Sequence, residues 1–422
     1  MEPNKGVLKN NLRVVSTYMT SVESVTVMIL VKSGSRYEEK RTNGIAHFAE
    51  HMFFKGTKKR PSAIAISSLI DGIGGEFNAF TSKEFTGYYV KASKDHIELC
   101  LDVVSDMLLN SLFAQAEIDR ERNVIAEEIR MYLDTPMRYV PDVYEALLYG
   151  DQPLGWDTAG TLESLKNIKR TDFFKYIKDF YTPSNMLVVI SGGVKPDKAK
   201  LLTDEFMGSI NDNKARGFLP VKLRQEKPEI KTHYKDSQQA HFCLGVRSYP
   251  RGHKYRYELA VLNTVLGSSM SSRLFIQLRE RRGLAYYVRS GIEEYYDAGS
   301  LVAQVGVMPK NIDEAIKVVL DEFAKICFEP VKEVELRKAK EYLKGKLILE
   351  LEDSREVSHL FGLQELLEES LRTPKEIISN IEKVTAEDIQ KVAKNIFKNE
   401  ILNLAIVGPY KDMSKFEKIL KF

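Results

Sequence analysis

The spacing of apolar residues along the chain predicts an alternation of strands and helices. Residues 24–34, SVTVMILVKSG, form an apolar run that indicates a buried strand, and residues 76–92 alternate like two paired strands. In residues 95–109, DHIELCLDVVSDMLL, apolar side chains recur every three or four positions, which predicts an amphipathic helix. Because strands and helices are mixed along the chain, the predicted class is α+β.

The second half of the chain repeats the pattern of the first. Residues 168–194 can be laid on residues 384–410 so that every pair is separated by 216 positions, as Asp172 and Asp388 are. Each segment reads as a helix opened by threonine and acidic residues, followed by a short buried strand that ends at glycine. The offset stays constant through helix, turn and strand, and we therefore interpret it as a duplication.

The repeat predicts two tandem, structurally similar α/β domains. We place the N-terminal domain at 1–210, a linker at 211–229 and the C-terminal domain at 230–422. The linker region is polar, contains glycine and proline and shows no helical stripe. A chain of 422 residues is also too long for one hydrophobic core, which agrees with this division.

The composition is that of an ordinary globular protein. Charged residues make up 29%, hydrophobic residues 43%, and the net charge of +3 gives no strong attraction to nucleic acid or anionic membranes. The three cysteines lie far apart without CxxC spacing, which is typical of a reducing compartment. No apolar run is long enough to span a membrane or to act as an N-terminal leader. We expect a cytoplasmic protein that binds neither nucleic acid nor membranes.

Residues 47–51, HFAEH, hold two of the seven histidines of the chain. In a helix, His47 and His51 lie one turn apart on the same face, with Glu50 beside them. Two imidazoles at this spacing can share a Zn²⁺ ion, and the carboxylate can reach a water bound to it. The order is the inverse of HExxH. The pattern leaves an alternative to the metal site open: the histidines lie on a solvent-exposed helix face or are packed in the core.

A catalytic zinc requires a third protein ligand and an open position. Residues 116–133 predict a helix on which Glu121 and Glu128, seven residues apart, share a face with apolar residues. We choose Glu128 as the ligand and Glu121 as an acceptor that holds a histidine ring, whereas Glu127 points toward solvent. The alternative is a surface face of salt bridges with the arginines of this helix.

The duplication assigns the metal to one half of the chain. At the offset of 216, none of the four polar positions His47, Glu50, His51 and Glu128 is kept in the second copy, and all are lost together. Their counterparts are Asn263, Leu266, Gly267 and Lys344. The second half must therefore contribute something else, most simply a wall or a set of substrate contacts.

With these motifs the chain resembles the pitrilysin/insulinase group of zinc metallopeptidases, and within it the bacterial relatives of mitochondrial processing peptidase. The resemblance covers essentially the whole chain. Besides HFAEH and the Glu-x6-Glu pattern, it includes residues 74–90, 180–194 and 271–288. It implies that His47, His51 and Glu128 bind one Zn²⁺ per chain, that Glu121 supports them, and that Glu50 activates the zinc-bound water.

The resemblance also implies substrate contacts. Asn78 and Ala79 would lie on an edge strand that takes up the substrate as an additional strand, with an ordinary strand as the alternative. Arg279 and Tyr286, in RERRGLAY, would bind the substrate backbone and stabilise the oxyanion. From the residues alone this stretch is a solvated helix end with a glycine cap. If the register of this motif is wrong, Tyr287 is the alternative to Tyr286 in the catalytic role.

The fold implied by the resemblance is two α/β halves that close like a clam shell around a central chamber. We expect a zinc-dependent endopeptidase that hydrolyses unfolded peptides or presequence-like segments inside this chamber. It could act alone, as a homodimer or with a partner subunit. The alternative is a non-catalytic peptide-binding or assembly subunit of a larger complex. The intact Glu50 argues against that alternative, because a structural metal site does not need it.

Overall fold

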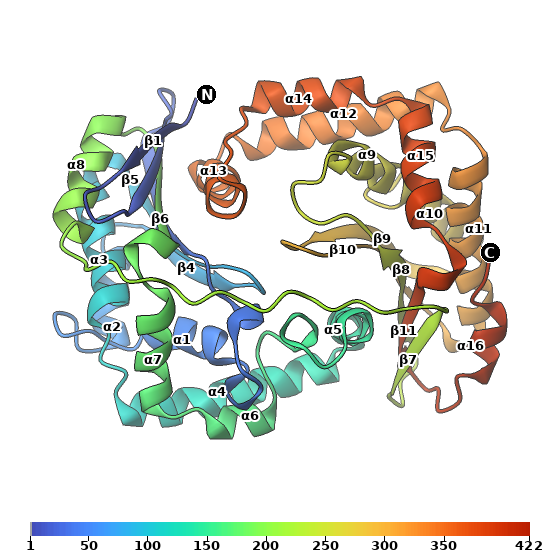
Figure 1. Cartoon of the computed structure of the whole chain (residues 1–422), viewed down its shortest axis with the longest axis horizontal. Coiled ribbons are helices and arrows are strands. Elements are labelled where there is room, and N and C mark those ends of the chain that lie inside the picture. The colour runs from blue at the N-terminus through green and yellow to red at the C-terminus, as the bar shows by residue number, and fades with distance from the viewer. Residues whose placement is uncertain (1) are drawn as a thin grey trace. The chain divides into compact units, whose positions relative to one another are not determined.

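The structure is a computed structural model that describes residues 2–422 (Figure 1). Its contacts divide the chain into two compact units. The first consists of Met1–Ile129, Trp156–Leu219 and Ile348–Pro374. The second consists of Arg130–Gly155, Pro220–Leu347 and Lys375–Phe422. Each unit contains one mixed sheet covered by helices, which confirms the α+β class.

The sheet of the first unit has six strands within the described residues, in the order β1-β2-β6-β3-β5-β4. Only β2 and β6 pair in parallel. β6 is buried along its length and β3 along nearly all of it, because helices cover both faces of the sheet. β4 lies at the edge. The strands are β1 (Asn4–Val7), β2 (Arg13–Tyr18), β3 (Ser24–Val31), β4 (Glu76–Thr81), β5 (Thr86–Ser93) and β6 (Met186–Gly192).

Two sets of helices cover this sheet. Neighbouring residues of β4 point to opposite faces, and Thr81 contacts helix α1 whereas Phe80 contacts helix α13, so α1 and α13 lie on opposite faces. The helices of this unit are α1 (Ile45–Phe53), α2 (Ala63–Asp71), α3 (Ile97–Asn110), most of α4 (Gln115–Asp134), α6 (Leu162–Asn167), α7 (Arg170–Phe180), α8 (Pro196–Met207) and α13 (Ser354–Glu368).

The sheet of the second unit has the order β7-β11-β8-β10-β9. Its strands are β7 (Glu229–Tyr234), β8 (Ala240–Arg247), β9 (Ala285–Glu294), β10 (Gly299–Val307) and β11 (Leu402–Gly408). Its helices are α5 (Pro136–Tyr149), α9 (Arg256–Leu266), α10 (Arg273–Phe275), α11 (Ile312–Phe328), most of α12 (Glu333–Glu350), most of α14 (Pro374–Lys383), α15 (Ala386–Ile396) and α16 (Ser414–Ile419). A π-helical turn, Ile276–Glu280, follows α10.

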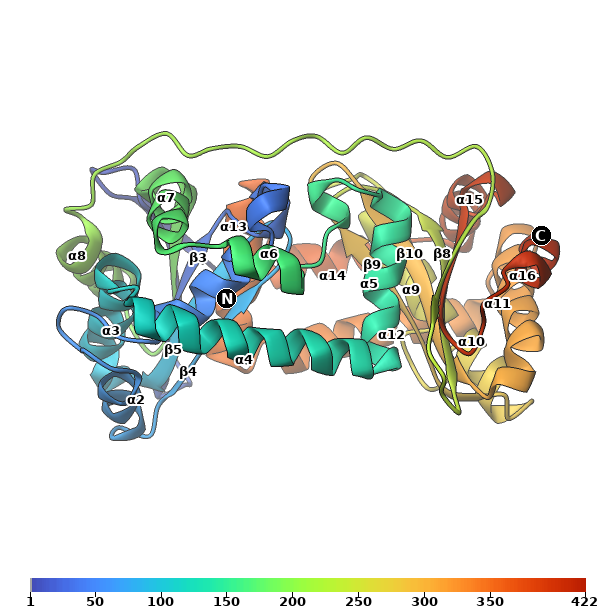
Figure 2. The same ribbon diagram turned by 90° about the horizontal axis from the view of Figure 1, so that it is seen from below.

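The offset of 216 recurs in the structure, which confirms the duplication. β2, β3, β6 and α7 begin 216 residues before β7, β8, β11 and α15. Two equivalent helices are exchanged between the units: α5 packs on β8 and β11 of the second unit (Figure 2), and α13 packs on β3 and β6 of the first. The units are therefore not two contiguous halves of the sequence. Residues 210–228 contain neither helix nor strand.

Among residues 2–422, no helix is both long and apolar enough to cross a membrane.

Candidate metal centre

The helix that carries HFAEH is fixed at its first turn by a buried carboxylate. Gly44 precedes α1 with φ of 95°, and a Cβ there would lie 2.5 Å from the carbonyl oxygen of Ala159. The Glu38 carboxylate accepts hydrogen bonds from the N–H groups of Gly44 (2.7 Å) and Ala46 (2.8 Å) and from Asn43 Nδ2 (2.8 Å). It thereby takes the place of a capping side chain. Burial raises the pKa of Glu38 to about 7, although these three donors oppose the rise.

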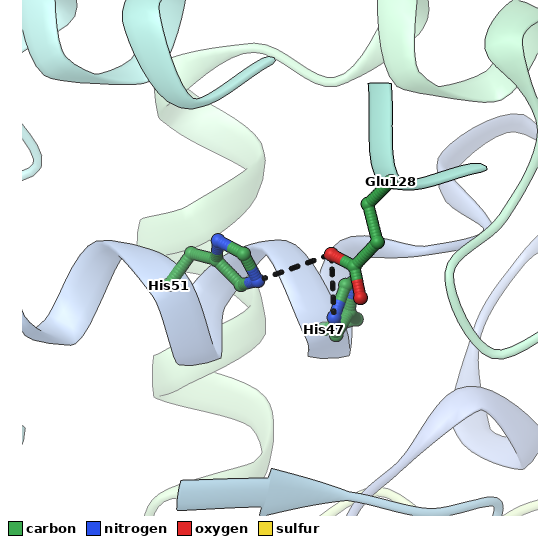
Figure 3. A group of neighbouring side chains, drawn as sticks. All are labelled: His47, His51 and Glu128. Carbon is green, nitrogen blue, oxygen red and sulfur yellow. Dashed lines mark ion pairs between the residues drawn. The ribbon is translucent and has the colours of Figure 1, made fainter. Parts of the chain in front are cut away.

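The two histidines and Glu128 converge from α1 and α4 (Figure 3). Phe48, Met52 and the other apolar residues of α1 are buried, which leaves the histidines on the opposite, partly exposed side. Oε2 of Glu128 lies 3.7 Å from Nε2 of His47 and 3.7 Å from Nε2 of His51. One ligand atom of each of the three residues lies within 4.8 Å of the other two.

This donor set fits a zinc ion. Ligand atoms about 2.1 Å from a tetrahedral zinc are separated from one another by roughly 3.4 Å, close to the 3.7 Å between Glu128 and each imidazole. Burial, and next the charge of His51, lowers the pKa of His47 to about 4, so the ring is neutral at physiological pH, which is the form that binds a metal. Among the described residues this is the one group of three or more such side chains that the structure brings together.

Glu121 links the centre to a lysine that the sequence pattern did not indicate. Its Oε2 lies 3.1 Å from Nδ1 of His51, and its Oε1 lies 2.7 Å from Nζ of Lys55. The Glu121 side chain is buried. A carboxylate on the second ring nitrogen directs the first toward the metal position. Lys55 follows His51 by four residues, and this spacing is the signal that could have placed it beside the histidine.

Glu50 projects from α1 toward the end of β4. The hydroxyl of Thr81 donates a hydrogen bond of 2.5 Å to Glu50 Oε2. Burial raises the pKa of Glu50, and the bond from Thr81 lowers it by a smaller amount. Thr81 was not among the expected site residues. Its position two residues after Ala79, on the same strand face, could have indicated it.

Asn78 and Ala79 lie in the middle of β4, the edge strand of the first sheet. The N–H of Ala79 donates to Oδ1 of the neighbouring Asn78 (2.8 Å). β4 pairs with β5 along one side only, within the described residues. The strand therefore offers its other side to an extended chain.

Arg279 lies in the second unit, where the backbone departs from a regular helix. It belongs to the π-helical turn Ile276–Glu280, and its guanidinium lies 5.2 Å from the centre of the Phe275 ring. Three residues after this turn, Gly283 has φ of 59° and donates its N–H to the carbonyl of Arg279 (3.1 Å). This is the glycine cap that the sequence predicted.

Tyr286 occupies a bulge in β9. Ala285 pairs with Val307 and Tyr287 pairs with Gly306, so Tyr286 is the extra residue between the two pairs. Its side chain is 46% exposed. A bulge redirects the residue that it contains, and here it leaves the phenol accessible.

In the second unit, other interactions occupy the positions equivalent to the three candidate metal ligands. Asn263 accepts a hydrogen bond from the Ser290 hydroxyl (2.6 Å), and a Cβ at Gly267 would lie 2.6 Å from the Ser290 nitrogen. Lys344 forms an ion pair with Glu341 (2.6 Å). The second copy thus has packing and ion pairs where the first has the candidate ligands.

The fold is duplicated, and one of its two copies brings together a set of donor atoms that fits zinc. Comparison with known families shows where the chain belongs. The family model "Insulinase (Peptidase family M16)" matches residues 13–162, and "Peptidase M16 inactive domain" matches residues 167–343. The chain belongs to peptidase family M16, as the resemblance predicted.

Similar proteins span the whole chain. The zinc protease YmxG of Bacillus subtilis is 37% identical over 96% of this chain and 98% of its own length, and a zinc protease of Mycobacterium leprae is 36% identical over 96% and 91%. The crystal structure of a protease from Helicobacter pylori superposes with a TM-score of 0.91 at 25% identity, covering 96% of this chain and 99% of that one. A chain of complex III2 from Candida albicans, 16% identical over 99% of this chain and 100% of its own, shares the fold with a TM-score of 0.85.

These relatives establish the enzyme class. The protein is a zinc-using metalloprotease, a hydrolase that acts on peptide bonds. The predicted enzyme class is thereby confirmed.

Proposed function

We propose that the chain is an endopeptidase for unfolded peptides or presequence-like segments and that His47, His51 and Glu128 hold its zinc ion. The convergence of their ligand atoms within 4.8 Å carries this proposal. When bound, zinc polarises the scissile carbonyl and increases the acidity of water. Because the ligand positions are lost in the second copy, the expected stoichiometry is one zinc per chain.

Glu50 acts as the general base. It removes a proton from the attacking water and later delivers a proton to the leaving amine. Burial raises its pKa, which makes the carboxylate a stronger base than one in water. Because Thr81 binds Oε2, the Oε1 atom is the one that takes the proton.

Asn78 and Ala79 bind the substrate backbone at the edge of β4. A peptide that pairs with this edge is held extended, and its backbone hydrogen bonds are independent of its sequence. This mode requires an unfolded substrate, because a folded protein has its backbone already paired.

Arg279 and Tyr286 bind the substrate backbone and stabilise the oxyanion. The π-helical turn and the bulge support this role, since both irregularities are common at functional sites. Tyr286 is preferred to Tyr287 because the Tyr287 hydroxyl is hydrogen-bonded to His241 Nδ1 (3.0 Å) and to Gln304 Nε2 (3.2 Å). The central chamber and a homodimer or partner subunit stay predictions.

The test is cleavage of a fluorogenic basic peptide, with the zinc content measured on every variant. Glu50→Gln should keep zinc and lose cleavage. Glu128→Gln should lose both, whereas Glu127→Gln, an exposed carboxylate one residue further back on the same helix, should keep both. Zinc in every variant together with unchanged cleavage by Glu50→Gln would overturn the proposal.

A further inference from the structure

A cavity lies beside β4 on the face opposite the metal helix. Its volume is about 250 Å³, and all the residues that line it belong to the first unit. The lining residues come from the sheet (Met28, Asn78, Ala79, Phe80 and Tyr89) and from α13 (Arg355, Glu356 and His359). The reaction proposed above uses Asn78 and Ala79 to bind the substrate backbone, but it gives no role to the three α13 side chains that line this cavity.

The register of the sheet shows which substrate residue would point into the cavity. Met28 lies opposite Tyr89, and Tyr89 lies opposite Asn78, so the three side chains form a row across β3, β5 and β4. In a sheet, residues directly opposite one another project to the same face. A substrate strand paired with the free edge of β4 extends this row by one residue, whose side chain points toward α13. Its two neighbours point toward α1 and the metal centre.

The walls of the cavity are neutral overall and rich in rings. Arg355 and Glu356 form an ion pair (Nη2 to Oε1, 3.0 Å), so their charges cancel. The Arg355 guanidinium also lies 5.9 Å from the centre of the Tyr89 ring. The His359 ring packs edge-on against Phe80, with ring centres 5.7 Å apart, and burial lowers its pKa, which favours the neutral ring.

These walls favour one class of side chain. A charged side chain would have to compete with the Arg355–Glu356 pair and lose its own hydration. An aromatic ring instead gains edge-to-face contacts with the rings, a sulfur contact with Met28 and a cation–π contact with Arg355. The cavity has room for such a ring.

We propose that this cavity is a specificity pocket that receives an aromatic side chain from the substrate residue paired with Asn78. The pocket rests on the proposed function, because it presumes strand addition at β4. It makes α13 a determinant of which peptides bind, although that helix holds no metal ligand.

The test measures peptide binding separately from cleavage. In the Glu50→Gln background, anisotropy gives the Kd of short fluorescein-labelled alanine–serine peptides in which a single phenylalanine is moved along the sequence. At the pocket position, phenylalanine should tighten binding about tenfold, less than full burial of a ring would give, because the side chains must be ordered. His359→Trp, which fills the cavity, should abolish that gain, and His359→Ala should reduce it. Leu360→Trp, one residue along α13, is the matched control and should leave the gain unchanged.

The outcomes separate the two proposals. Loss of the phenylalanine preference in His359→Trp but not in Leu360→Trp supports the pocket, even if the wild type cleaves none of the peptides and the proposed function fails. Binding of all peptides with no preference, or the same response in both tryptophan variants, overturns the pocket. Absence of any binding overturns strand addition and the pocket together.

Discussion

Thr81→Val tests whether the hydroxyl that holds Glu50 matters for catalysis. Valine keeps the β-branched shape that suits the end of β4 but removes the 2.5 Å hydrogen bond to Glu50 Oε2. A hydrogen bond to a charged group contributes about 1.5–3 kcal/mol. If all of this free energy stabilises the transition state, removing the hydrogen bond lowers kcat by about 10- to 150-fold.

Two effects of the substitution oppose each other. Loss of the bond frees the carboxylate to rotate, which slows proton transfer. It also removes an interaction that lowers the pKa of Glu50, so the pKa rises further and the carboxylate becomes a stronger base. The greater basicity of Glu50 offsets only part of the slower proton transfer. We therefore expect kcat to decrease by about tenfold. The acidic limb of the kcat/KM profile should move to higher pH.

The assay is kcat and KM against pH for wild type, Thr81→Val and Thr81→Ser, with zinc content measured on each. Serine restores the donor and should restore both the rate and the acidic limb. If Thr81→Val matches the wild type, or if Thr81→Ser is as slow as Thr81→Val with full zinc, then the hydroxyl does not position Glu50. A change confined to KM would contradict the argument as well.

Three further substitutions test other contacts. Glu121→Gln should weaken zinc binding by about 10- to 100-fold in a chelator competition, because the residue no longer offers a carboxylate to His51 and Lys55; unchanged affinity would contradict the role. Burial raises the pKa of Glu38 from its ordinary 4.5 to about 7, so between these pH values the folded state keeps a proton that the unfolded state has lost. The free energy of unfolding should therefore fall by about 3 kcal/mol as pH rises from 4.5 to 7. Denaturant titrations at several pH values should show this slope, and Glu38→Gln should remove it. Tyr286→Phe should lower kcat more than it changes KM, which steady-state kinetics will measure. Tyr287→Phe should instead alter thermal stability more than kcat, which melting curves will show.

Local spacing was sufficient to predict part of the centre. His47 and His51 are one helical turn apart, and the seven-residue spacing of Glu121 and Glu128 places both carboxylates on one face of α4, so each pair follows from the geometry of a single helix. Which helices meet is a different matter. Glu128 was chosen as the third ligand from the pattern of its helix, with a salt-bridged surface face left open as the alternative. The family resemblance then favoured the ligand, because composition and periodicity give no distances between elements.

The contacts that escaped prediction depend on pairing between distant segments. The Thr81 contact requires the position of β4 beside α1, and the cavity requires α13, which is far along the sequence and has its sequence equivalent, α5, in the other unit. A contiguous division at 211–229 assigns α13 to the second domain, where it could not line a pocket on the first sheet. The exchange of two equivalent helices leaves no trace in hydrophobic periodicity, since each helix buries an apolar face in either arrangement.

The alternation of β4 explains how one strand can serve both chemistry and selection. Thr81 faces α1 and holds the Glu50 carboxylate, whereas Asn78 and Phe80 face α13 and border the cavity, which Ala79 between them also lines. A substrate strand on this edge alternates in the same way, so one of its residues meets the pocket while the next meets the metal centre. Substitutions in α13 can then change the preferred substrate without moving a ligand on α1 or α4, because the sheet lies between them. The second half of the chain would thus retain a role in the first unit even though it has lost the residues that bind the metal.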